Sequence, residues 1–462
     1  MAAVRSSRPV ATEGVAEPAG AIQPLRYPSA LTGWVTVGVL FVLYILSLAD
    51  RLIVALQVDA IKAGLHLTDL QIGMLQGPAF AVLYALFAIP VGLALDRYSR
   101  RLVMFASIFV WSLAATACGL ATGFVFLLIA RALVGAGQAG FGTGAYSIIG
   151  DSFAPAKVSV AMSVFVMGGI MGAGITFLLG GPLVRHVLET GVSVWPLLGT
   201  VAPWQKVFIY VGAPGLVLAF LVFAFQEPRR HAAPKAGVGG GYAEAWRFIG
   251  QHPRTFAAIF LGFGLVYSMT IAMQQWSPAF FARVYGWRPD QIGVRLGLAQ
   301  ILGALTLPLH GMIVNHLMRK GRQDAPLLWC MLTGLVALPL AIAAYWVRDG
   351  WLSIILIGLY FGFMLASASM GPAAVQLVTP QHLRGRISAL YVMCTGLIAM
   401  ALGTSVVGVF TDKVFADPAR VGDSLIATVF LVMAPGIALY AWGRAGLRRS
   451  MPDVVGNDGT AR

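Results

Sequence analysis

The chain has 462 residues, of which 58% are hydrophobic and only 11% are charged. Soluble globular proteins carry about 25% charged residues, so this composition excludes an ordinary soluble fold. The net charge of +14 would suit a nucleic-acid-binding protein, but its distribution along the chain indicates a membrane protein that binds no nucleic acid.

Twelve charge-poor stretches are long enough to cross a bilayer, which takes about 20 apolar residues. The first six cover residues 27–49 (continuing to 58), 70–95, 102–121, 123–150, 158–184 and 207–226, and the second six cover 255–282, 296–318, 325–347, 350–378, 387–411 and 425–443. These runs are too long and too continuously apolar for barrel strands. The sequence therefore predicts an all-α membrane protein with twelve transmembrane helices in two pseudo-symmetric six-helix bundles.

The basic residues predict the topology of these spans. Of the 32 Lys and Arg residues, 21 lie in the termini and even-numbered loops, 9 lie in the odd-numbered loops, and Arg51 and Arg131 lie within spans. The positive-inside rule then places both termini in the cytoplasm. The 26 Arg against 6 Lys and the absence of an Asn-x-Ser/Thr site fit a multi-pass protein of a bacterial inner membrane.

We divide the chain into a disordered cytoplasmic tail (1–30), an N-terminal bundle (31–226), a cytoplasmic linker (227–252), a C-terminal bundle (253–446) and a cytoplasmic tail (447–462). The glycine-rich stretch 231–241 of the linker is flexible by composition, and we expect disorder after Arg449.

One pattern occurs twice, about half a chain apart. The first copy is Gln71-Ile72-Gly73, an apolar run, and then residues 92–101. The second copy is Gln291-Ile292-Gly293, an apolar run, and then residues 311–320. This self-similarity predicts two homologous halves, a plan common among transporters.

The segment 92–101 carries a candidate gate. Gly92 would let another helix pack closely, Asp96 would face the positive N-terminus of a neighbouring helix, and Arg97, Arg100 and Arg101 would pair with acids or lipid phosphates. The alternative is an ordinary basic cluster beside the membrane.

These residues resemble the signature of the major facilitator superfamily, and 131–137 resembles its second motif. Residues 50–51 with 67–73, 225–230 and 383–391 are similar to the Spinster family. The resemblance implies alternating access to a central cavity, and a cytoplasmic lock in which Asp96 holds the second span against the eleventh. Ser99 stands where the superfamily usually has Gly. Asn315 replaces the acid in the second copy, so any lock there should be weaker.

Asp50 is the only acid deep within a span, where a charge costs at least ~2.5 kcal/mol. Arg131 lies at a similar depth, ~12 Å below the outer surface, so the two side chains should pair if spans 1 and 4 are neighbours, as the resemblance implies. We predict that Asp50 titrates and couples proton movement to transport. A static ion pair that fixes helix register, or a direct role in binding substrate, are the alternatives.

Gln138 lies two helical turns beyond Arg131 on the same face and completes the predicted proton-coupling group. Spinster-like sequences commonly have an acid here. Glutamine is isosteric with a protonated glutamic acid but does not titrate. Coupling then rests on Asp50 alone, or this position is held in one protonation state, and an engineered substitution is also open. Arg51 and Arg131 are the predicted contacts for a substrate head group.

Polar residues in spans 1, 4, 7 and 10, which line the cavity in the implied fold, form a looser candidate set. They are Tyr44, Ser47, Thr143, Tyr146, Tyr267, Thr270, Gln274, Gln275, Tyr360 and Ser367. For each of them, an interhelical hydrogen bond or interfacial anchoring is the alternative role.

The sequence has no phosphate-binding loop, no His/Cys cluster at metal spacing and no nucleophile with a plausible base, so we expect no cofactor, no metal and no enzymatic activity. We expect a monomeric, proton-coupled secondary transporter surrounded by membrane lipids. Arginines beside apolar walls suit a small amphiphilic anion, and the resemblance implies a lysophospholipid or sphingolipid. The alternatives are a multidrug or organic-anion/proton antiporter and, in another class, a membrane lipid receptor without transport.

Overall fold

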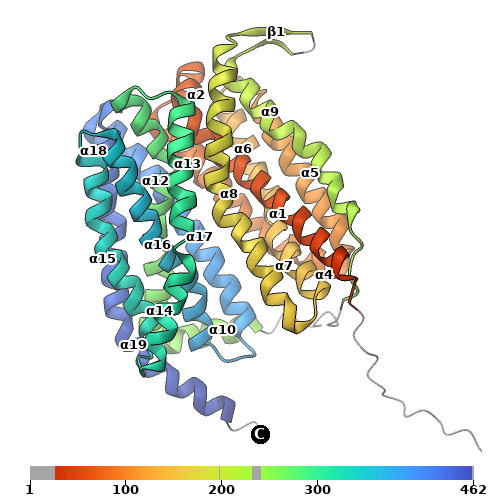
Figure 1. The fold of residues 1–462 in the computed structure, drawn as a ribbon, viewed down its shortest axis with the longest axis vertical. Coiled ribbons are helices and arrows are strands. Elements are labelled where there is room, and N and C mark those ends of the chain that lie inside the picture. The colour runs from red at the N-terminus through yellow and green to blue at the C-terminus, as the bar shows by residue number, and fades with distance from the viewer. Residues whose placement is uncertain (1–26, 197, 231–240, 460–462) are drawn as a thin grey trace, which may run out of the picture.

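The structure is a computed structural model that describes residues 27–196, 198–230 and 241–459. Two bundles of helices stand side by side in it (Figure 1). Most of the predicted N-terminal tail, residues 231–240 of the predicted flexible linker, and the last three residues lie outside the described part of the chain.

The N-terminal bundle contains six membrane-length helices, several of them interrupted. Its elements are α1 (Ala30–Leu52), η1 (Ile53–Gln57), α2 (Val58–Leu65), α3 (Asp69–Gln76), α4 (Pro78–Arg97), α5 (Arg100–Cys118), α6 (Phe124–Gln138), α7 (Phe141–Ser152), α8 (Pro155–Glu189), the hairpin of β1 (Ser193–Trp195) and β2 (Gly199–Val201), α9 (Pro203–Leu218) and η2 (Ala219–Ala224).

The C-terminal bundle repeats this plan after a linker helix, α10 (Gly241–Gln251). Its elements are α11 (Pro253–Ala257), η3 (Ala258–Gly262), α12 (Phe263–Tyr285), α13 (Pro289–Ala304), α14 (Leu307–Arg319), α15 (Ala325–Trp346), α16 (Gly350–Val378), α17 (Arg384–Val409), η4 (Phe410–Phe415), η5 (Pro418–Arg420), α18 (Val421–Thr428), η6 (Val429–Met433) and α19 (Ala434–Gly459).

Twelve helices within the described ranges are long and apolar enough to cross a membrane. The predicted fold class is therefore confirmed. Proline explains one interruption: α3 ends at Gln76, the backbone of Gly77 is not helical, and Pro78, which lacks an N–H to donate, opens α4.

The molecule has two ends, which we call the terminal face and the distal face. α1 begins and α19 ends at the terminal face, where α10 also lies, whereas α2, α18 and the β1–β2 hairpin lie at the distal face (Figure 1). A buried lysine holds the base of this hairpin. Lys206 Nζ donates to Thr190 Oγ1 at 3.0 Å, to the Gly191 carbonyl at 2.7 Å and to Ser193 Oγ at 2.6 Å.

The structure adds a helix within the linker, and it extends the last span beyond the sequence-based expectation. The linker contains α10, whose Glu244 pairs with His382 (3.2 Å), just before α17, and with Arg386 (3.7 Å) in the first turn of α17. The chain also does not become irregular after Arg449, because α19 stays helical to Gly459.

Candidate functional site

A cavity of about 220 Å³ lies between the two bundles. Helices from both halves line it: α1 and α8 from the N-terminal bundle, and α12, α13, α16 and α17 from the C-terminal bundle. The polar residues in its wall are Tyr44, Arg51, Tyr267, Thr270, Gln274, Gln275 and Gln300, and the rest of the wall is apolar. Among the residues that the structure describes, Arg51 is the only Lys, Arg, Asp or Glu in this wall.

Arg51 is held by neutral groups. Its Nη2 donates to Gln138 Oε1 at 2.9 Å, and its guanidinium lies 4.3 Å from the centre of the Phe80 ring. Gln138 Nε2 in turn donates to the Ser47 carbonyl at 3.1 Å. An ionised glutamate at position 138 would have no proton to donate to that carbonyl. Glutamine therefore orients Arg51 without neutralising it, and the cavity keeps an unpaired positive charge.

Arg131 does not form the predicted side-chain ion pair with Asp50. Its Nη1 donates to the backbone carbonyl of Asp50 at 2.7 Å, its Nη2 to that of Arg51 at 3.3 Å, and its Nε to that of Leu75 at 3.3 Å. The reason is local, because α1 ends at Leu52 and the last carbonyls of a helix lack partners within it. The guanidinium satisfies these carbonyls rather than the carboxylate.

The Asp50 carboxyl group is buried, with 2% of the residue exposed, and among the described residues neither of its oxygens has a hydrogen-bond partner. The indole N–H of Trp111 lies within reach but not in hydrogen-bond geometry. Burying an ion without a hydrogen-bonding partner is costly. An ionised Asp50 would therefore need a partner that the described residues do not supply in this conformation.

The other predicted cavity residues divide into two groups. Tyr44, Tyr267, Thr270, Gln274 and Gln275 line the cavity, whereas Ser47, Thr143, Tyr146, Tyr360 and Ser367 do not. Tyr360 lies behind the wall with its hydroxyl 3.3 Å from Thr270 Oγ1, and Ser367 accepts from Tyr440 at 3.4 Å. Tyr146 packs edge-on against Phe165, and Thr143 bonds to the Gly140 carbonyl.

The sequence reasoning missed Gln300, which lines the cavity and whose Oε1 accepts from Gln274 Nε2 at 3.3 Å. It lies in span 8, outside the four spans in which candidates were sought. A polar residue on the face opposite the lipid-facing leucines of that span was the available signal.

At the terminal face, Arg100 is a buried hub rather than a lipid contact. Its Nη1 lies 2.5 Å from Asp151, its Nε lies 3.2 Å from Glu227, and its Nη2 donates to the Pro228 carbonyl at 2.6 Å. Burial on its own would raise the pKa of Glu227, but hydrogen bonds from the Ser99 hydroxyl and from the Arg100 backbone and guanidinium hold that pKa below its usual range. The hub ties α5 to the end of α7 and to the segment after η2.

The same segment caps α4. Arg230 Nη2 donates to the carbonyls of Leu95 (2.7 Å) and Tyr98 (2.6 Å), and its Nη1 donates to that of Asp96. The predicted gate residue Arg101 lies nearby, 5.2 Å from the Phe223 ring, while Arg97 is exposed.

The predicted lock between Asp96 and span 11 is not formed in this conformation. Asp96 is exposed, and a Cβ on Gly92 would meet nothing within 4 Å. Gly311, its counterpart in the second copy, is equally open. No other part of the described chain packs against either glycine, so the lock is not closed here.

At the distal face, ion pairs between side chains join the two halves. Arg283 of α12 lies 2.7 Å from both Asp59 and Asp69, and Lys62 lies 3.0 Å from Asp69. Asp412, at the distal end of span 11, accepts from the backbone N–H of Asp69 at 3.1 Å and of Leu70 at 2.6 Å. A carboxylate at the start of α3 satisfies two of its free amides and complements its dipole. We call this group the distal latch.

The structure explains the repeated Gln-Ile-Gly pattern. Gln71 and Gln291 each accept, through Oε1, the backbone N–H three residues earlier, at 2.9 and 3.2 Å, and so cap a helix start. The glycines allow close crossing of the halves: a Cβ on Gly73 would lie 2.6 Å from the Thr404 carbonyl oxygen, and one on Gly293 would lie 2.7 Å from the Cα of Gly181. Span 5 therefore crosses span 8 closely at Gly181.

Two six-helix bundles around a central cavity, joined at the distal face and apart around Gly92, define a multi-pass membrane transporter of the secondary class. Residues 39–404 match the family model described as Major Facilitator Superfamily. The chain belongs to that superfamily, and the predicted Spinster-like character is confirmed by its relatives.

Its sequence is 27% identical to an MFS-type efflux pump of Mycolicibacterium smegmatis over 423 residues, which cover 90% of this chain and 94% of that protein. It is 24% identical to protein spinster homolog 1 of Xenopus laevis, covering 81% of this chain and 72% of that protein. These relatives are transporters, in agreement with the prediction that this chain is not an enzyme.

Among solved structures, the chain is similar to a bacterial homolog of the human lysosomal transporter Spinster in an inward-facing and unoccupied conformation. The TM-score is 0.75 at 21% identity, covering 93% of this chain and 99% of that one. A D-xylose-proton symporter also shares the fold, with a TM-score of 0.60 at 14% identity, covering 86% of this chain and 97% of that one.

Proposed function

We propose that this protein is a proton-coupled transporter that moves an amphiphilic anionic lipid, such as a lysophospholipid or a sphingolipid, by alternating access. The carrying observation is Arg51, an uncompensated cation in a cavity wall that is otherwise neutral and largely apolar. A phosphate or carboxylate head group would pair with Arg51, and the apolar wall would take the hydrocarbon chain.

Arg131 has a different role in this proposal from the one expected from sequence. Each of its three guanidinium nitrogens donates to a backbone carbonyl, so it positions α1 beside α3 rather than contacting the head group. Arg51 alone is then the head-group ligand, with Gln138 as its positioning residue.

Asp50 carries the proton in this scheme. It lies next to Arg51 in α1, and its buried carboxyl group has no hydrogen-bonding partner. Loss of its proton would create a buried charge that attracts the neighbouring guanidinium groups, and uptake of a proton would release them. A change in the position of Arg51 would then alter the affinity for the anion, which links the proton to the cargo.

The positive-inside rule places the terminal face in the cytoplasm of a bacterial cell, with the protein in the inner membrane. The conformation, joined at the distal face, is then inward-facing, like that of the Spinster homolog with the similar fold.

A second candidate is a multidrug or organic-anion/proton antiporter. The similarity to an MFS-type efflux pump favours this candidate, and it also favours export as the direction. Arg51 would repel a cation, so transport of cationic drugs would count against the head-group site and transport of organic anions would agree with it. A lipid receptor would bind the same ligands but move neither ligand nor protons.

The test is ligand-dependent proton movement in liposomes that contain the purified protein, compared between wild type, Asp50→Asn and Arg51→Gln. Lysophospholipid-driven proton flux that is lost in Asp50→Asn supports coupling through Asp50. Lipid movement that ignores the pH gradient and survives the mutation would refute coupling. Equal uptake of lipid by Arg51→Gln and wild type would refute the head-group site, and binding without any movement would indicate the receptor.

A further inference from the structure

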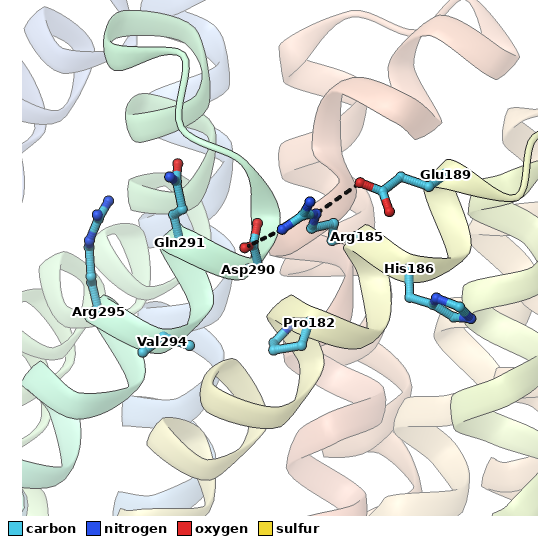
Figure 2. Close-up of a pocket in the computed structure, with 8 residues that line it drawn as sticks. All are labelled: Pro182, Arg185, His186, Glu189, Asp290, Gln291, Val294 and Arg295. Atoms are coloured by element: carbon cyan, nitrogen blue, oxygen red, sulfur yellow. Dashed lines mark hydrogen bonds and ion pairs between the residues drawn. The ribbon is translucent and has the colours of Figure 1, made fainter.

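A second pocket lies outside the central cavity, at the distal end of the seam between α8 and α13. It measures about 470 Å³, and its lining residues include Arg185, Glu189, Asp290 and Arg295. Figure 2 shows Arg295 on α13 at one side, Arg185 and Glu189 on α8 at the other, and Asp290 between them. The pocket shares no lining residue with the central cavity.

The two arginines of this pocket are in different states. Arg185 is satisfied, because its guanidinium lies 2.8 Å from both Glu189 and Asp290. Arg295 has no carboxylate partner among the described residues, and its Nη1 is buried without a hydrogen bond. A buried donor on a cation that lacks a partner indicates an anionic ligand.

Two tryptophans hold the Arg295 guanidinium in place. Its Cζ lies 4.1 Å from the ring centre of Trp287 and 4.2 Å from that of Trp351. Trp287 is itself stacked on Phe281 at 4.8 Å. The side chain is therefore positioned in advance by its cation–π contacts, and binding an anion would cost little additional ordering.

The depth of the pocket along α13 favours a lipid phosphate over a soluble anion. Arg295 is the seventh residue of α13, which places it about 9 Å along the axis from the start of the helix. Tryptophans gather at the interface between membrane and water, and Trp287 and Trp351 mark that level here. Lipid phosphates lie at this depth.

An apolar ridge runs from the pocket toward the membrane interior. Val294, Leu298 and Leu302 follow at four-residue spacing on one face of α13, and all three are exposed. Gln300, which lines the central cavity, lies on the other face of the same helix. A ligand in this pocket therefore has an exposed hydrocarbon surface directly below its polar part.

We propose that this pocket binds a phospholipid of the distal leaflet, with its phosphate on Arg295 and an acyl chain along the ridge of Val294, Leu298 and Leu302. The lipid is a resident ligand rather than cargo. The pocket is lined by α8 as well as by α13, and these helices belong to different halves, so a head group that fills the pocket contacts both and stabilises the joined distal face.

The site is tested by thermal unfolding of the full-length protein in a mild detergent with increasing dioctanoyl phosphatidylglycerol. The lipid should raise the unfolding midpoint of the wild type. Arg295→Gln should raise the lipid concentration needed by about tenfold, the loss expected for one charge-assisted contact. Arg348→Gln, which removes an exposed arginine of the same face, should behave like wild type.

Three further measurements fix the chemistry. Dioctanoylglycerol, which lacks the phosphate, and sodium phosphate alone should each leave the midpoint unchanged. Leu298→Gln keeps every charge of the pocket and should also weaken the lipid response, which protects the test if Arg295→Gln folds poorly. An equal response in Arg295→Gln and wild type, or an equal effect of dioctanoylglycerol, would overturn the proposal. An Arg295-dependent response to phosphate alone would instead indicate a site for a soluble anion.

Discussion

A single substitution in the distal latch, Arg283→Gln, should shift the equilibrium between joined and separated distal faces. The Arg283 guanidinium donates two hydrogen bonds to the Asp69 carboxylate, at 2.7 and 3.1 Å, and the Asp69 side chain is fully buried. Glutamine cannot supply this charge. Asp69 would then keep only Lys62, at 3.0 Å, while the distal face remains joined.

The magnitude follows from burial. Breaking a buried ion pair costs about 3–5 kcal/mol, and the remaining Lys62 places the cost near the lower end, about 3 kcal/mol. The contact of Arg283 with Asp59, whose side chain is 49% exposed, adds little. A cost of about 3 kcal/mol corresponds to roughly a hundredfold fall in the ratio of joined to separated distal faces.

The assay is the distance between spin labels on two exposed distal residues, Ala63 of the N-terminal half and Arg348 of the C-terminal half, after replacement of the three native cysteines. Arg283→Gln should move the distance distribution toward longer values. Arg288→Gln is the matched control, since Arg288 is exposed and lies 3.6 Å from its acid, and it should change the ratio less than about threefold. A folded Arg283→Gln protein with the wild-type distribution would refute the latch.

Three other substitutions have defined outcomes. Gln138→Glu gives Arg51 a titratable partner that ionises as the pH rises. Over that pH range the affinity for an anion, measured by ligand titration, should fall about tenfold more than it does in the wild type. Parallel affinity curves for the two proteins would contradict this. Gly73→Ala should lower the free energy of unfolding by about 1–3 kcal/mol because its Cβ meets the Thr404 carbonyl, whereas Gly38→Ala, whose Cβ meets nothing within 4 Å, should not. For Glu227, the folded pKa lies below the usual value, so its contribution to stability is present at neutral pH and is lost as the pH falls through that folded pKa. The difference in unfolding midpoint between wild type and Glu227→Gln should therefore close below about pH 4, and a difference that persists in acid would contradict this.

The fold could be predicted because it rests on composition. Charge-free runs of about 20 residues have one outcome in a bilayer, and the repeat at Gln71 and Gln291 divides the chain into halves. The breaks within the spans were harder to predict from the sequence. Gly77 and Pro78 mark a break in span 2, but nothing local to Leu52 marks the end of α1 in the middle of a span.

The same interruption limited the prediction of the site. Matching Asp50 and Arg131 by depth correctly brought them together, but depth carries no information on which atoms meet. The guanidinium bonds to the backbone carbonyl because α1 ends there. The distal latch was missed for a related reason, since Arg283, Asp69 and Asp412 lie at the ends of three different spans, and only the assembled halves place them together.

Two glycines without close neighbours, Gly92 and Gly311, indicate that the protein has a second conformation. Gly73 and Gly293 are crowded by the opposite half, whereas Gly92 and Gly311 lie at the other end of the same two spans with open space around them. Glycine in the interior of a helix costs about 1 kcal/mol relative to alanine, so a position that stays open gains nothing from lacking a side chain. The open pair makes sense as the contact surface of a different arrangement of the halves. Gly92 and Gly311 thus indicate a close contact between the halves that is absent from this conformation and would form in another one.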